Sequence, residues 1–313
     1  MTAYIIRRLL ATIPVMVVVA IFVFLLLHLT PGDPAAVIAG DDATPEAVDG
    51  IRTKLGLDQP IHVQFGIYAA NLLRGDLGTS IFSNLPVLTL VKQRLEPTLV
   101  LAASTLVMAV LLAIPMGVLA AWKARTFIDR LVMGFSVLGF AVPGFLVGYL
   151  LIYVFAIELK WLPVQGYRPL SQGIDQTARS IILPALALSM AYMALIARMT
   201  RASMLDVLSQ DYIRTAKAKG VATLIVLLRH ALKNAAVPIV TVIGIGLTLL
   251  ISGVVITETV FNIPGLGRLT VDAILKRDYP IIQGLIILFA GAKVLVNLLI
   301  DISYVFFDPR IRY

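Results

Sequence analysis

The segment DYIRTAKAKGVATLIVLLRHALKNAAVP, residues Asp211–Pro238, lies between two strongly apolar stretches of the chain. Its first ten residues have a helical composition, because Ala216 and Ala218 alternate with lysines before Gly220. Small residues permit close approach of another backbone, and a glycine permits a sharp exit from a helix. The segment therefore predicts a short basic helix that either docks on another protein or lies in solvent or against lipid phosphates.

The composition around this segment is that of a membrane protein. Of 313 residues, 59% are hydrophobic and 14% are charged, against about 25% charged residues in a soluble domain. The absence of Cys excludes disulfides, thiolate metal sites and thiol catalysis, and the presence of only three His argues against a histidine metal site. We expect neither a catalytic site nor a metal site in this chain.

Apolar stretches predict an all-α integral membrane protein with six transmembrane helices. They cover roughly 9–29, 98–121, 131–157, 181–200, 236–257 and 281–305, and each reaches the ~20 residues that cross a bilayer. The fourth is the weakest, because Pro184, Ser189 and Tyr192 interrupt it. The first follows two arginines but exceeds the ~7–15 apolar residues of a signal peptide, so we expect an uncleaved helix.

Charge distribution predicts the orientation of these spans. Segments 1–8, 122–130, 198–235 and 306–313 would share one side of the membrane, and they hold 14 Lys and Arg but only four acids. The positive-inside rule places them, and with them both termini, in the cytoplasm. Topology thus explains the net charge of +8, and binding to nucleic acid is not needed to explain it.

Two segments on the opposite side are longer than simple connectors. Residues 31–95 predict a small extracytoplasmic cap containing a short helix, with Thr44 as N-cap, Pro45 at its first position and Gly56 at its end. Residues 258–280 form the second outer loop, in which prolines and glycines mark a tight turn between apolar residues. This loop either dips into a pore, contacts an external partner, or is an ordinary interfacial loop.

The order of motifs along the chain resembles ATP-binding-cassette (ABC) importer permeases of the dipeptide/oligopeptide/nickel group, specifically their B-type transmembrane subunit. DYIRTAKAKG, followed by His230, Asn234 and Pro238, resembles the "EAA" coupling loop of that family. The resemblance covers nearly the whole chain and includes LTPGDP at 29–34, LGLDQP at 55–60, GDLGTS at 75–80, RLEPTL at 94–99, ETVFNIPGLG at 258–267 and DPRIR at 308–312. One departure is Val221–Leu228, which is unusually apolar where relatives carry polar residues.

The resemblance implies a type I ABC importer permease fold in a bacterial inner membrane. It implies a first transmembrane helix at 1–30, the cap at 31–95 and a permease domain at 96–313 with a cytoplasmic coupling loop at 201–235. The implied partners are a second, C-type permease, two ABC ATPase subunits, an extracytoplasmic binding protein and membrane lipid. The cargo would be di- or oligopeptides or a related small solute, such as glutathione or a nickel chelate.

Three groups of residues carry these expectations. The expected ATPase-coupling residues are Asp211, Tyr212, Arg214, Ala216, Lys217, Gly220, His230 and Asn234. The pore or gating candidates are Tyr149, Tyr153, Tyr192 and Asn297. The residues expected in the extracytoplasmic partner loop are Phe261, Pro264, Gly265 and Gly267.

The chain has no GxxxxGK[ST] loop that would hold a nucleotide. We therefore expect ATP and Mg²⁺ to bind in the partner ATPases, and not in this chain. The alternative is an ion-coupled secondary transporter or channel, in which Lys293 and Asp301 of the last span would carry the coupling. An intramembrane hydrolase would need a nucleophile paired with a base, and no motif links such residues here.

Overall fold

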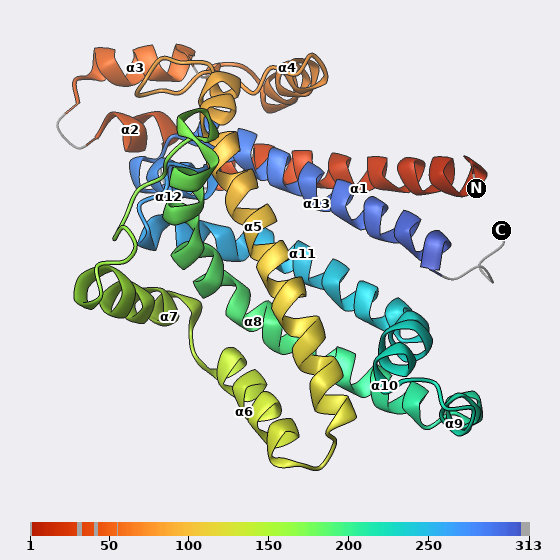
Figure 1. Cartoon of the computed structure of the whole chain (residues 1–313). Helices are drawn as coiled ribbons and strands as arrows, with labels where there is room; N and C mark the ends of the chain where they lie inside the picture. Colours follow the sequence, from red (N-terminus) through yellow and green to blue (C-terminus); the bar gives the residue numbers. More distant parts are fainter. Residues whose placement is uncertain (1, 30–32, 41–42, 55, 308–313) are drawn as a thin grey trace. The chain divides into compact units, whose positions relative to one another are not determined.

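The computed structural model of the chain describes residues 2–29, 33–40, 43–54 and 56–307. Its regular structure is helical throughout this described part (Figure 1). The chain divides into two compact units. The N-terminal unit comprises residues 1–95 and 269–295, and the central unit comprises residues 96–268 and 296–313.

The N-terminal unit contains a long helix followed by three short ones. These are α1 (Thr2–Leu29), α2 (Pro34–Ala39), α3 (Pro45–Lys54) and α4 (Ile61–Leu73). The unit also includes the start of α5 (Val87–Trp122), the end of α12 (Leu266–Lys276) and most of α13 (Tyr279–Phe307). The predicted helix after Thr44 is confirmed as α3, and the Thr44 hydroxyl accepts a hydrogen bond from Ala47 N at 3.4 Å.

Aromatic packing and a buried carboxylate hold the N-terminal unit together. Phe24 of α1 packs edge-on against Phe65 of α4, with ring centroids 5.3 Å apart. Gln283 of α13 donates to the Val23 carbonyl of α1 at 3.1 Å. Asp278 is almost fully buried and accepts a hydrogen bond from the Ser80 hydroxyl at 2.5 Å. These bonds join parts of the unit that are far apart in the sequence.

The central unit is organised around one long helix, α8 (Ile174–Leu208). Helices α6 (Phe127–Ala141), α7 (Gly144–Leu151) and α11 (Ala236–Val260) all pack against it. Shorter elements complete the unit: the π-helical turns η1 (Ile152–Glu158) and η3 (Val226–Leu232), the 3₁₀ turn η2 (Leu170–Gln172), α9 (Asp211–Ala218) and α10 (Thr223–Ile225).

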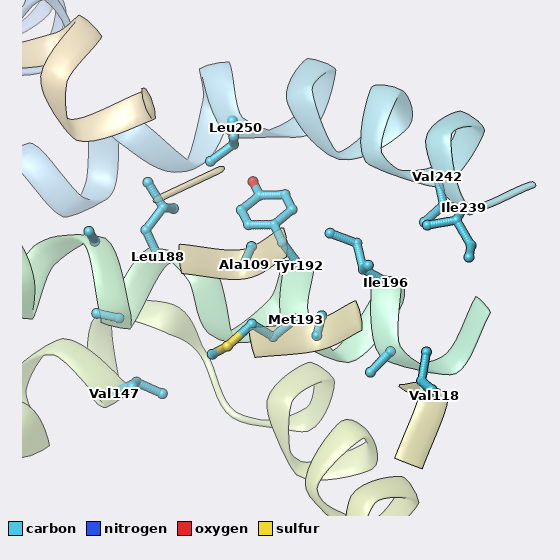
Figure 2. Packing of buried hydrophobic residues seen from close by; sticks show 14 of the residues in the cluster. Ala109, Val118, Val147, Leu188, Tyr192, Met193, Ile196, Ile239, Val242 and Leu250 are labelled. Atoms are coloured by element: carbon cyan, nitrogen blue, oxygen red, sulfur yellow. The ribbon is translucent and has the colours of Figure 1, made fainter. Parts of the chain in front are cut away.

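The expectation that the fourth span would be the weakest is wrong. It is a continuous 35-residue helix and the most buried of the candidate spans. The Ser189 hydroxyl donates to the Leu186 carbonyl of its own helix at 2.9 Å, so this polar group needs no external partner. The Tyr192 ring projects from α8 toward α11 and packs beside Leu188 and Leu250 (Figure 2).

The third span, expected as one helix over 131–157, is broken. Helix α6 ends at Ala141, α7 begins at Gly144, and the two axes differ by 106°. The cause is Pro143, which disfavours helical dihedrals at the residue before it; Val142 accordingly has φ −88° and ψ 124°. Among the described residues there are five continuous candidate spans, or six if this bent pair crosses as one, which agrees with the six predicted crossings.

Helices α5 and α8 approach closely at Gly117, and we predict that Gly117→Ala destabilises the protein. A Cβ there would lie 2.5 Å from the Thr200 Cβ and 2.7 Å from the Ala197 carbonyl oxygen. Because one of these atoms is backbone, the helices must separate, at a cost of about 1–3 kcal/mol. The apparent Tm of the purified, assembled transporter measures this loss.

The matched control is Gly134→Ala in α6, where nothing lies within 4 Å of the added Cβ. That substitution is expected to raise stability by about 0.5–1 kcal/mol, because alanine favours a helix over glycine. Equal effects of the two substitutions on Tm would contradict the close contact at Gly117.

Candidate functional site

The predicted short helix at the start of the basic segment is present as α9, Asp211–Ala218. Asp211 lies in its first turn and Lys217 in its last, so both charges complement the helix dipole. Ile213 is fully buried and belongs to the hydrophobic core of the central unit. The side chain of Ile213 therefore fixes the helix to the membrane domain, while most of the other α9 residues remain exposed.

The end of α9 is set by Gly220. Val221 N donates to the Ala216 carbonyl at 3.2 Å and Gly220 N donates to the Lys217 carbonyl at 3.0 Å, which is the Schellman pattern. Gly220 has φ +78°, a left-handed conformation that strains residues with a Cβ. Nothing lies within 4 Å of a Cβ placed there, so glycine is required for its conformation and not for space.

Three of the expected coupling residues meet at one point on the surface. The Tyr212 hydroxyl accepts a hydrogen bond from Asn234 Nδ2 at 3.0 Å, and the same amide donates to the His230 carbonyl at 2.6 Å. These bonds join α9 to the end of η3, directly before α11 begins at Ala236. These contacts connect α9 to the segment that leads into α11, a helix that packs along α8.

The outward face of α9 carries exposed charges. Arg214 contacts Asp211 at 3.2 Å, but both side chains are largely exposed, so the pair adds little stability. Lys217 is also exposed, and Ala216 is half-buried toward the domain. In the apolar segment that follows, Val226 and Leu227 are buried while Leu224 and Leu228 are exposed.

The four pore or gating candidates do not form one cluster. Tyr149 and Tyr153 are both exposed, on α7 and η1, whereas Tyr192 is buried on α8. Asn297 on α13 is exposed, and its Oδ1 accepts a hydrogen bond from the Thr248 hydroxyl at 3.2 Å. Of the two charges in the last span, Lys293 is exposed, and the side chain of Asp301 lies outside the described residues.

The outer loop is ordered by a buried carboxylate that sequence reasoning missed. Glu258 is fully buried, and it accepts hydrogen bonds from the Thr98 hydroxyl at 2.6 Å and Arg268 N at 3.0 Å. The Thr98 oxygen in turn accepts from Leu266 N at 2.8 Å. The signal in the sequence was an acidic residue at the end of an otherwise apolar span.

The residues expected to contact an external partner lie around Glu258. Phe261, Gly265 and Gly267 are buried within the chain, and Pro264 is exposed. A Cβ at Gly265 would lie 2.1 Å from Glu258 Oε1. Glycine is therefore required where the loop crosses the carboxylate, and the exposed part of the loop includes Pro264.

A second hydrogen-bonded group supports the same loop. Gly166 N donates to the Phe261 carbonyl at 2.9 Å, and the adjacent Tyr167 hydroxyl donates to Glu96 Oε1 at 2.8 Å. Burial, followed by the bond to Glu96, raises the pKa of Tyr167 above its usual value. The hydroxyl thus stays protonated and keeps donating across the physiological pH range.

A second pair that sequence reasoning missed joins α6 to α8. Arg201 donates to both oxygens of Asp129, with Nε–Oδ1 at 2.5 Å and Nη2–Oδ2 at 2.7 Å. Arg125 N adds a third bond to this carboxylate at 2.9 Å.

In the described part of the chain no group of three or more His, Asp or Glu is arranged to hold a metal ion.

Comparisons with known proteins define the class. Residues 113–313 match the family described as "Binding-protein-dependent transport system inner membrane component", and residues 1–102 match the N-terminal family of the same systems. The chain belongs to this family of ABC importer permeases. The resemblance stated from the sequence is thereby confirmed. The all-helical importer permease fold is confirmed by the solved structure described below, whereas the extracytoplasmic position of the segment after the first helix stays a prediction.

Individual relatives within this family match the chain over its full length. The chain is 56% identical to a probable peptide ABC transporter permease of Sinorhizobium fredii, over the full length of both chains. It is 45% identical to a glutathione transport system permease of Escherichia coli, again over both full lengths. Among solved structures, it resembles the MetNI methionine ABC transporter with a TM-score of 0.59 at 16% identity, covering 71% of this chain and 97% of that one.

Proposed function

We propose that this chain forms half of the translocation pore of an ATP-driven importer of di- or oligopeptides. The full-length relatives named for peptide and for glutathione transport support this cargo class. A C-type permease would complete the pore, and a binding protein would deliver the cargo from outside. Two ATPase subunits would bind ATP and Mg²⁺.

We also propose the orientation that the charge distribution predicts. Both termini and the coupling loop at 201–235 face the cytoplasm of a bacterium, and the cap at 31–95 faces outward. The membrane-spanning composition and the inner-membrane family support this placement. The same topology sets the proposed boundaries of the cap, which begins after the first transmembrane helix ends at residue 30 and ends at residue 95, before the permease domain.

The observation that carries the proposal is the structure of α9. Its Ile213 is anchored in the core of the membrane domain, its charged face is exposed, and Tyr212 is hydrogen-bonded to Asn234 before α11. A displacement of α9 by a protein bound to its exposed face would therefore also displace α8 and α11. Two ATPase states would shift the pore only if they contact α9 differently.

Gly220→Val tests this role. A branched residue at φ +78° is strained, so the Schellman end of α9 is expected to be lost. Uptake of the dipeptide Ala-Leu per ATP hydrolysed should then fall about tenfold or more in proteoliposomes that contain the assembled transporter, while ATP hydrolysis continues.

Gly220→Asn is the matched control, because asparagine tolerates the left-handed conformation better than other residues with a Cβ. It should retain most of the uptake. Normal uptake by an assembled Gly220→Val transporter would contradict the assignment of α9 as the coupling element.

A further inference from the structure

The central unit contains a pocket at the break between α6 and α7. Its volume is about 340 Å³, and its walls come from the α6–α7 break and from the facing sides of α8 and α11. Most of the lining is apolar, including Val142, Leu188, Met190 and Ile256. These walls suit an aliphatic or aromatic group of a small solute.

The start of α7 lines one end of the pocket. Gly144 and Phe145 are lining residues at the start of the helical segment Gly144–Glu158, and Pro143, directly before it, lines the pocket as well. Pro143 precedes the helix without a side-chain cap. The first N–H groups of a helix have no acceptor within it and carry the positive end of its dipole, so they favour an anion.

A buried hydroxyl supplies a second, independent donor. Tyr192 is only 9% exposed, and among the described residues its hydroxyl has no hydrogen-bond partner. The ring lies along α11, and its oxygen is 3.3 Å from the position of a Cβ at Gly253, which lines the pocket. The hydroxyl of this largely buried side chain therefore has no acceptor within the described chain, and an acceptor on a molecule bound in the pocket would supply one.

A cation lies on the same face of α8 as the pocket. Ala191 lines the pocket, and Arg198 follows it by seven residues, two helical turns or about 10 Å along the axis. The Arg198 guanidinium lies over the Phe140 ring, 5.4 Å from its centroid. A positive charge on this face favours an anionic group over an amine, although its effect is screened because Arg198 is exposed.

We propose that this pocket binds the free carboxylate end of the transported peptide, with the apolar side chain of its last residue against the walls. The carboxylate accepts hydrogen bonds from the α7 N-terminus and from Tyr192. The proposal rests on the proposed function for the identity of the cargo. The choice of carboxylate over amine follows from the donors alone.

Cysteine labelling tests the site, because the chain contains no native Cys. Ala191→Cys places one thiol in the pocket wall, and N-ethylmaleimide labelling of this chain is followed in the full permease–ATPase complex without binding protein. The dipeptide Ala-Leu is expected to slow labelling, and its C-terminal amide to protect about tenfold less well at equal concentration. Leu150→Cys, exposed on α7 outside the pocket lining, is the control that neither compound should protect.

Tyr192→Phe, added to Ala191→Cys, removes the hydroxyl and keeps the ring. In this double variant, Ala-Leu should slow the labelling of Cys at position 191 only about as much as the C-terminal amide does. Equal protection by acid and amide, or undiminished protection after Tyr192→Phe, would overturn the proposal. If the transporter takes up Ala-Leu but the dipeptide does not slow labelling of Ala191→Cys, the pocket is not the binding site, and the proposed function stands. If Ala-Leu slows labelling but the transporter does not take it up, the proposed function is wrong, and the pocket stands.

Discussion

Glu258→Ala is expected to destabilise the protein by about 3 kcal/mol or more, one of the two largest effects predicted here. The carboxylate is fully buried and accepts hydrogen bonds from the Thr98 hydroxyl and from Arg268 N. Each bond to a charged acceptor contributes about 1.5–3 kcal/mol, and the substitution removes both of these bonds. The apparent Tm of the assembled transporter measures the change.

A double substitution tests whether the geometry around Glu258 is the cause. Gly265→Ala alone should also destabilise the protein, because its Cβ would lie 2.1 Å from Glu258 Oε1. Once the carboxylate is removed, that clash no longer exists. The double variant Glu258→Ala/Gly265→Ala should therefore be clearly more stable than the sum of the single effects predicts.

Glu158→Ala serves as the control for the loss of an acid at an exposed position. It should change stability by no more than about 0.5 kcal/mol. A Glu258→Ala protein that unfolds at the wild-type temperature, or strictly additive effects in the double variant, would show that the carboxylate does not order the loop.

Asp129→Ala is expected to have the second large effect, a loss of about 3 kcal/mol in stability. It removes a buried carboxylate that receives two bonds from Arg201 and leaves that arginine, itself only 26% exposed, without its partner. The pair joins the start of α6 to the part of α8 that leads into α9. Peptide uptake should therefore fall together with the apparent Tm.

Replacing both partners distinguishes the ion pair from simple packing. Asp129→Leu/Arg201→Met fills similar volume without a buried charge, and such replacements are often neutral or stabilising. Its Tm should recover most of the loss seen with Asp129→Ala. If the double variant is no more stable than Asp129→Ala, the destabilisation does not arise from an unpaired charge.

Features that depend on neighbouring residues were predictable from the sequence. The length of the apolar runs predicted the spans, and the alternation of alanine and lysine before Gly220 predicted α9. Thr44 and Pro45 predicted the start of α3. Each of these signals lies within one continuous stretch of the chain, so no knowledge of tertiary structure was required.

Features that depend on distant residues were not predictable. Thr98 and Glu258 are 160 positions apart, and Asp129 and Arg201 are 72 positions apart, so nothing local to either residue indicates the pairing. The break at Pro143 was missed for a different reason. Proline is tolerated inside several other helices here, including α8 at Pro184, and only the surrounding packing decides where it ends one.

The bend between α6 and α7 also restricts which surface of this chain can meet acyl chains. Hydrocarbon offers no hydrogen bonds, so backbone outside a helix is tolerated at membrane depth only where protein or water covers it. Val142 and Pro143 are such backbone, within a pair of helices that together are long enough to cross. If the bent pair lies at membrane depth, this side of the chain must therefore be covered by protein or open to water, and lipid cannot cover it.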